Sequence, residues 1–410
     1  MQLVLVPLRE ARTVCLTTTW RCGFVDDPMN MPGMAHLMEH LVFQGTERYS
    51  REAYYRNYLG VGGSTNASTR TEHTSFCAEF PSVLLPTAMA MEADRFTAIA
   101  PSAERIAHES RIIRQEIGST LGARPFGAFP WAEVQNALFD NYAYRHNGYV
   151  SCQWMADVST ADCVTFLQKN YRPEQAAVCL VGQFDPAHVL DLAERTFGQI
   201  ERSALPAVRA LPVPVRTPTT IVSEHRGAPC CATSLAWRVP ELSDARRGAG
   251  VIGLVGALNR TGARDLREKS GHAVHLYQVD YGMFQDMFAL TTGAYLLVQL
   301  YHACGQGRDL AASVQSELHR LGREPLAGNV ITDSAATVIQ GIDRRCTEPP
   351  LLSRILAEQA AIHGSPWHLL QVRDSLTQLS GEQVALKAAE LAARTPAVVH
   401  ACSTGSRTCP

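Results

Sequence analysis

Residues 34–45, MAHLMEHLVFQG, place two histidines four positions apart, with a glutamate directly before the second. We expect this stretch to be a helix, because Gly45 follows its last apolar residues, where a glycine commonly ends a helix. On a helix, His36 and His40 point from the same face, so their two imidazoles can hold one zinc ion. Glu39 lies beside them and can act as a base on a water molecule. The alternative is a surface helix that carries three polar residues by chance.

The order H-x-x-E-H is that of the inverted zincins, but it supplies only two ligands. A catalytic zinc site needs three protein ligands and an open position. Residues 108–118, HESRIIRQEIG, place Glu109 and Glu116 two helical turns apart on one face. Glu116 can be the third ligand, and Glu109 can accept a hydrogen bond from a zinc-bound histidine.

The isoleucines of the same segment predict an adjoining buried stripe, formed by Ile112, Ile113 and Ile117. The alternative for the two glutamates is a solvated face on which they pair with nearby arginines, namely Arg105, Arg111 or Arg114.

Three segments together resemble the pitrilysin/insulinase and mitochondrial-processing-peptidase type of zinc metallopeptidase. They are residues 33–46 (GMAHLMEHLVFQGT), residues 62–76 (GGSTNASTRTEHTSF) and residues 108–118. The C-terminal half adds LREKSGHAV at 266–274, so the resemblance spans nearly the whole chain.

The resemblance implies a zinc endopeptidase with one zinc ion per chain, held by His36, His40 and Glu116. It makes Glu39 the general base that activates water, and Glu109 an auxiliary acidic member of the catalytic group. Such an enzyme cleaves peptides inside a chamber, and peptide maturation or leader removal is a role by analogy.

The resemblance also implies the substrate-binding residues. Asn66 and Ala67 match an edge strand that pairs with an extended peptide through main-chain hydrogen bonds. Arg267 matches the arginine of an Arg/Tyr pair that reaches the substrate. The tyrosine position, however, is Val274, which cannot donate a hydrogen bond.

Because one oxyanion donor typically contributes a factor of about 100 to 1,000 in rate, we expect a homologous partner subunit to supply the Arg/Tyr pair in a heterodimer. A homodimer with a shifted pairing is the alternative. A non-catalytic partner or scaffold subunit, and a structural zinc site, are further alternatives that the complete set of five polar residues disfavours.

The composition fits a globular protein of two domains: 410 residues, 46% hydrophobic, 19% charged and a net charge of −2. This charge balance gives no reason to expect nucleic acid or a membrane surface as a partner. The first residues do not form a secretory signal, so we expect a cytoplasmic location. Most of the 12 cysteines are expected to be small buried residues, without a disulfide framework.

The expected fold class is α+β, with two homologous half-shell domains that each pack helices on a mostly antiparallel sheet. A proline-rich stretch at 204–219 is predicted to be an extended linker. It would join an N-terminal metallopeptidase domain, 1–203, to a homologous domain without metal, 220–410.

Overall fold

The computed structural model describes residues 1–148, 152–202, 218–272, 274–281, 290–324 and 326–403. Nearly all of the predicted linker, 204–219, lies outside the described residues. By its internal contacts the chain divides into two compact units. Unit 1 comprises Met1–Gln115, Ser151–Leu211 and Arg344–His368. Unit 2 comprises Glu116–Val150, Pro212–Asp343 and Leu369–Pro410.

Unit 1 is built on a five-stranded sheet in the order β1-β5-β2-β4-β3. Only β1 and β5 pair in parallel, and the other neighbours are antiparallel. The strands are β1 Gln2–Pro7, β2 Thr13–Trp20, β3 Ser64–Thr69, β4 Thr74–Pro81 and β5 Ala176–Gly182. The interior strand β5 is buried along its whole length, whereas β3 is an outer strand with partly exposed residues.

Unit 2 repeats this arrangement with a sheet in the order β6-β10-β7-β9-β8. Its first strand again pairs in parallel with its last, and the remaining pairs are antiparallel. The strands are β6 Thr220–His225, β7 Cys231–Arg238, β8 Val274–Tyr281, β9 Tyr295–His302 and β10 Ala397–Ser403. The predicted α+β class with two similar, mostly antiparallel sheets is confirmed.

Helices cover each sheet. Those of unit 1 are α1 Met34–Phe43, α2 Arg51–Asn57, α3 Leu85–Asp94, α4 Ala103–Gly122, α7 Thr160–Asn170, α8 Pro186–Thr196 and α12 Pro349–His363. Those of unit 2 are α5 Trp131–Leu138, α6 Tyr142–Arg145, α9 Ala245–Ser270, α10 Gly307–Arg323, α11 Gly328–Cys346, α13 His368–Thr377 and α14 Gly381–Ala392. The end of α4 continues into unit 2, and the ends of α11 and α13 reach into unit 1. No helix within the described ranges is long and apolar enough to cross a membrane.

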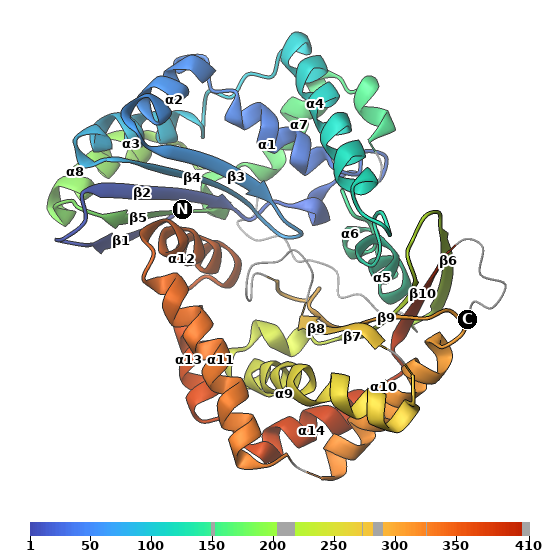
Figure 1. Ribbon diagram of the computed structural model, residues 1–410. Coiled ribbons are helices and arrows are strands. Elements are labelled where there is room, and N and C mark those ends of the chain that lie inside the picture. The colour runs from blue at the N-terminus through green and yellow to red at the C-terminus, as the bar shows by residue number, and fades with distance from the viewer. Residues whose placement is uncertain (149–151, 203–217, 273, 282–289, 325, 404–410) are drawn as a thin grey trace. The chain divides into compact units, whose positions relative to one another are not determined.

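The two halves of the sequence exchange one helix each. Helix α12 comes from the C-terminal half, yet it packs on β2 and β5 of the N-terminal sheet (Figure 1). Leu356, Ala357 and Ala360 of α12 join a core cluster with residues of β1 and β5. Helix α5 comes from the N-terminal half and packs on β10 and β7. The predicted domains, 1–203 and 220–410, are continuous stretches of sequence, whereas the compact units exchange these helices. The predicted division therefore stays a prediction.

The ends of α1 are fixed by its neighbours in sequence. The Asp27 carboxylate accepts hydrogen bonds from the backbone N–H of Gly33 at 2.6 Å and of Ala35 at 2.8 Å, at the positive end of the helix. Gly45 follows the helix with φ +94°, as predicted for a terminating glycine, and a Cβ there would lie 2.4 Å from the Tyr49 carbonyl oxygen. The motif is therefore held on a helix of defined length.

The cysteines differ in part from the expectation. Cys231 and Cys304 form a disulfide with their Cα atoms 5.1 Å apart. Eight others are free and either buried or partly buried, as expected of small apolar side chains. Disulfides are typical of oxidising compartments, so the expected cytoplasmic location stays a prediction.

Candidate metal centre

Helix α1 carries His36, Glu39 and His40 on a face that is largely withdrawn from solvent. His36 is 3% exposed and Glu39 is 9% exposed, while the His40 side chain is 18% exposed. The two imidazole rings lie 4.9 Å apart, centroid to centroid. Polar side chains this deeply buried need partners, so a surface helix with chance polar residues does not describe α1.

Helix α4 brings Glu109 against His40. The Glu109 carboxylate is 2% exposed, and one of its oxygens lies 2.9 Å from His40 Nδ1. Its other oxygen accepts a hydrogen bond from the Gln44 side-chain amide. A carboxylate only accepts, so His40 Nδ1 carries the proton and Nε2 remains as the ligand atom.

Glu116 completes a set of three possible ligands. The boundary between the compact units falls within the continuous helix α4, and Glu116 is the first residue after it. The ligand atoms of His36, His40 and Glu116 all lie within 4.8 Å of one another. A tetrahedral zinc ion with bonds of about 2.1 Å places its ligand atoms about 3.4 Å apart. Two imidazoles and one carboxylate therefore fit zinc after small side-chain movements, and they leave one position open.

The electrostatics of His36 favour the form that binds metal. Burial, with a smaller contribution from the neighbouring His40, lowers the pKa of His36 to about 3. His36 is therefore neutral at ordinary pH, with a lone pair on the ring to offer to a metal ion.

Glu39 is oriented by the edge strand of the sheet. Thr69 Oγ1, at the end of β3, donates a hydrogen bond of 2.6 Å to Glu39 Oε2. One carboxylate oxygen of Glu39 is thus held in place, while the residue also lines a hollow of about 220 Å³ with His40 and Glu109. Asn66 and Ala67 of β3 line the same hollow. The predicted zinc ligands, base and edge strand are therefore brought together on neighbouring elements.

Of the two predicted positions in the C-terminal half, Arg267 and Val274, the structure describes the side chain of Val274 alone. Arg267 belongs to α9, but its side chain lies outside the described part of the structure. Val274 begins β8, is 3% exposed and pairs with His302 of β9. The position that the resemblance gives to tyrosine is therefore a buried apolar strand residue.

One part of the predicted buried stripe on α4 is wrong. Ile113 and Ile117 are buried, at 0% and 4% exposure, but Ile112 is 37% exposed and lines the hollow beside Glu109. Ile112 lies three residues after Glu109 on the helix, so it shares the face that carries the site. The arginine-paired alternative for Glu109 also fails, since its carboxylate contacts His40 and Gln44.

Sequence reasoning missed three residues that support the site: Asp27, Gln44 and Thr69. Each acts through a hydrogen bond to a main-chain group or to a candidate residue. Asp27 precedes the helix too far upstream to be recognised as its cap, and nothing in the sequence aligns Thr69 with Glu39. Gln44 lies four residues after His40, and this helical spacing was the one usable signal.

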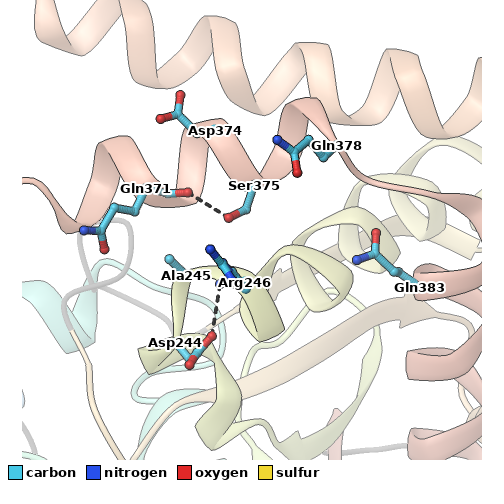
Figure 2. A pocket seen from close by; sticks show the side chains of 8 residues that line it. All are labelled: Asp244, Ala245, Arg246, Gln371, Asp374, Ser375, Gln378 and Gln383. Atoms are coloured by element: carbon cyan, nitrogen blue, oxygen red, sulfur yellow. Dashed lines mark hydrogen bonds between the residues drawn. The ribbon is translucent and has the colours of Figure 1, made fainter.

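A further hollow of about 760 Å³ lies within unit 2 and is unrelated to these residues (Figure 2). It is lined by Asp244, Ala245, Arg246, Gln371, Asp374, Ser375, Gln378 and Gln383. The polar groups of this hollow bond within their own segments: Ser375 Oγ donates to the Gln371 carbonyl at 2.8 Å, and the Arg246 N–H donates to Asp244 Oδ1 at 3.0 Å. We assign it no catalytic role.

Comparison with known proteins agrees with this geometry. Residues 7–121 match the model of the insulinase family, peptidase family M16, and residues 157–252 match that of the peptidase M16 inactive domain. The chain is 25% identical to a probable mitochondrial-processing peptidase subunit beta of Schizosaccharomyces pombe over 185 residues, which cover 42% of this chain and 37% of that protein. It is 26% identical to an uncharacterized zinc protease of Mycobacterium bovis over 284 residues, which cover 68% of this chain and 64% of that protein.

The fold has a close counterpart among solved structures. A protease from Helicobacter pylori superposes with a TM-score of 0.81 at 16% sequence identity, covering 97% of this chain and 96% of that one. The chain matches less than two thirds of the length of each of these two curated relatives.

The fold and the candidate metal group of His36, His40 and Glu116 are consistent with the zinc proteases to which the chain is similar. The chain belongs to peptidase family M16, in the short two-domain form that is similar to bacterial M16 proteases.

Proposed function

We propose that this chain is a zinc-dependent endopeptidase that cleaves extended peptides. The observation that carries the proposal is the grouping of His36, His40 and Glu116, whose ligand atoms lie within 4.8 Å, beside the carboxylate of Glu39. This donor set leaves an open coordination position, which a structural zinc site does not need.

A zinc ion in this site would polarise the scissile carbonyl and lower the pKa of the attacking water. The Glu39 carboxylate takes a proton from that water and delivers it to the leaving amine nitrogen. Thr69 holds Glu39 in orientation through its hydrogen bond of 2.6 Å. Glu109 acts one step further out, because it fixes the ring and tautomer of His40.

The substrate is proposed to bind as an added strand on β3. This strand is the outer member of the sheet, and Asn66 and Ala67 line the hollow that also contains Glu39 and His40. Main-chain hydrogen bonds to an edge strand hold a peptide with little demand on its sequence. Peptide maturation or leader removal is the proposed role, and it rests on analogy.

The chain is further proposed to work with a homologous partner subunit, so that dimerisation closes the chamber and the partner supplies an Arg/Tyr pair. The support is Val274, which has no hydrogen-bonding side chain and is buried at the position where a tyrosine would be needed. A homodimer is the competing arrangement. Size measurement together with activity, with and without candidate partners, separates the two.

The test of the proposed function compares wild type with Glu39→Gln on a mixture of synthetic peptides, followed by mass spectrometry. We expect the wild type, with its partner where one is required, to cleave internal bonds. Glu39→Gln should keep its zinc and lose at least about 100-fold in rate, since general-base catalysis contributes typically 10² to 10⁴. Glu104→Gln is the matched control, because Glu104 is an exposed glutamate on α4. Equal cleavage by Glu39→Gln and wild type contradicts the role of Glu39 as the base. A wild type that holds zinc but cleaves nothing with any partner favours a scaffold subunit instead.

A further inference from the structure

A buried hydroxyl in unit 2 joins two histidines from the neighbouring strands. Thr233 of β7 is 0% exposed, and its Oγ1 lies 2.9 Å from Nε2 of His302 on β9 and 2.9 Å from Nδ1 of His400 on β10. His302 and His400 are themselves 2% and 5% exposed. We call these three side chains the histidine relay, and all three belong to unit 2.

The hydrogen bonds give the relay one direction. His302 Nδ1 lies 2.8 Å from the carbonyl oxygen of Ala303, so this nitrogen carries a proton and donates it. Nε2 of the neutral His302 ring is then an acceptor, and the Thr233 hydroxyl donates to it. The same hydroxyl oxygen accepts from His400 Nδ1, which therefore carries a proton. All of these bonds are satisfied together while His302 is neutral.

A proton on His302 Nε2 breaks this arrangement. The Thr233 oxygen would then face two N–H donors, and its own hydroxyl proton would lose its acceptor in a buried place. Burial lowers the pKa of His302, although the hydrogen bond to Ala303 acts in the opposite direction, and burial also lowers the pKa of His400. Both rings are therefore neutral at pH 7, and acid favours any open state in which they meet water.

The groups around the relay do little to offset an added proton. Smaller contributions to the low pKa of its histidines come from three neighbours, namely Arg308 of α10, His275 of β8 and His272 just before β8. The acidic neighbours are exposed and screened by water, namely Asp309 of α10, which is 73% exposed, and Glu224 of β6. Burial raises the pKa of the Cys230 thiol beside the His302 main chain, so this thiol stays uncharged in acid. Glu133 of α5 lies on the other face of the sheet, where it bonds to Ser223 of β6.

The start of α10 packs directly on the relay. Gly307 is its first residue, and a Cβ there would lie 2.7 Å from Thr233 Oγ1 and 2.8 Å from His400 Nδ1. The N-terminus of a helix carries a partial positive charge, which disfavours a further positive charge on His400. Protonation of the relay therefore opposes the contact between α10 and the sheet.

The disulfide Cys231–Cys304 holds His302 in the sheet from two sides. Cys231 is the register partner of His302 on β7, and Cys304 follows His302 by two residues. Because the strand is tied in this way, the His302 ring meets water when α10, which covers the relay, moves away.

We propose that the histidine relay is an acid-sensitive switch that releases the start of α10 from the sheet of unit 2 when the pH falls below about 6. The stabilisation is fully present above the ordinary histidine pKa of about 6.5, and it is lost as the pH falls towards the lowered pKa values of the folded protein. This regulation of unit 2 needs neither zinc nor substrate, so it goes beyond the proposed peptidase function.

The test is hydrogen exchange of the full chain at pH 7.5 and at pH 5, followed by mass spectrometry of peptides that cover α10 and corrected for the chemical exchange rate at each pH. A histidine that is neutral in the closed state and protonated in the open state favours opening by about tenfold per pH unit. We expect the protection of α10 in wild type to fall about 100-fold between the two pH values, since two histidines contribute. His302→Gln removes one of them, and its α10 should lose only about tenfold.

Matched variants make the result specific. His319→Gln removes an exposed histidine of the same helix and should respond as the wild type does. Thr233→Ser keeps the hydroxyl and should keep the full acid response. Thr233→Val removes the hydroxyl that favours neutral His302, and should reduce the response at least about threefold. The thermal midpoint at pH 7.5 shows whether each variant is folded, and the Thr233 variants decide the matter if His302→Gln is not.

Three results would overturn the switch. The first is a wild-type α10 whose protection at pH 5 stays within about twofold of that at pH 7.5. The second is a folded His302→Gln protein that responds as fully as the wild type. The third is a Thr233→Val protein that responds as Thr233→Ser does. None of these measurements depends on zinc or cleavage, so failure of the switch and failure of the proposed function are distinguishable.

Discussion

Replacement of Glu109 by glutamine tests how the metal site is held in place. Glu109 is 2% exposed and accepts hydrogen bonds from His40 Nδ1 and from the Gln44 amide. Glutamine keeps the size of the side chain but replaces one acceptor oxygen by an NH₂ group. That group can face His40 only as a donor, which would disfavour the tautomer that leaves Nε2 free for zinc.

The size of the effect follows from the position of Glu109. It is not a ligand itself, and loss of such an outer partner typically lowers metal affinity or activity by about 10- to 100-fold. This corresponds to about 1.4 to 2.7 kcal/mol of zinc-binding free energy. The fold should change less, because glutamine can still bond to Gln44 or His40 and leaves no buried charge.

The assay is competition for zinc with a fluorescent chelator, together with urea unfolding of the zinc-free protein. Glu104→Gln, on the exposed face of the same helix, should bind zinc as the wild type does. A zinc affinity of Glu109→Gln within about twofold of the wild type would refute the positioning role of Glu109. If Glu109→Gln loses zinc affinity only because the zinc-free variant is unfolded, the positioning role of Glu109 is refuted as well.

Four other changes test the supporting elements. Asp27→Ala removes the carboxylate that accepts from Gly33 and Ala35 N–H, and should lower the free energy of unfolding by about 1–2 kcal/mol in urea titration; an unchanged value contradicts the capping role. Thr69→Val removes the hydrogen bond to Glu39 with little change of shape, and should reduce the cleavage rate about tenfold while zinc content stays the same; full activity would show that Glu39 needs no such orientation. Gly45→Ala places a Cβ 2.4 Å from the Tyr49 carbonyl oxygen at φ +94°, and should destabilise the fold by more than about 1 kcal/mol, measured by urea unfolding; a neutral effect contradicts the need for glycine at the end of α1. Free zinc at 100 times its dissociation constant should raise the free energy of unfolding by about 2.7 kcal/mol over that of the chelated, zinc-free protein, equally in wild type and Glu39→Gln. A thermal midpoint that is the same with and without zinc contradicts a native metal site.

The sequence predicts the grouping of His36, His40 and Glu116 because its signals are local. The spacing of His36 and His40 and of Glu109 and Glu116 is set by the helical repeat alone, and both helices are present. The error at Ile112 has the same origin, because periodicity identifies a stripe but cannot decide which of its borders faces the site.

The long-range partners carry no such signal. Helix α12 joins the N-terminal sheet from more than 150 residues downstream, and its Ser353 bonds to Thr17 at 2.8 Å across that separation. The sequence of an amphipathic helix does not indicate which sheet the helix will cover. The hydrogen bond from Thr69 to Glu39 depends on the packing of α1 against β3, so it too emerges only from the structure.

The most direct test of the metal centre is the zinc content of purified protein in wild type, Glu116→Gln and Glu104→Gln, measured by mass spectrometry of the metal after dialysis. Both mutated glutamates are exposed on α4, but only Glu116 groups with His36 and His40. We predict one zinc ion per chain in wild type and Glu104→Gln, and a strongly reduced content in Glu116→Gln. Equal zinc in all three proteins, or none in the wild type, would contradict the account.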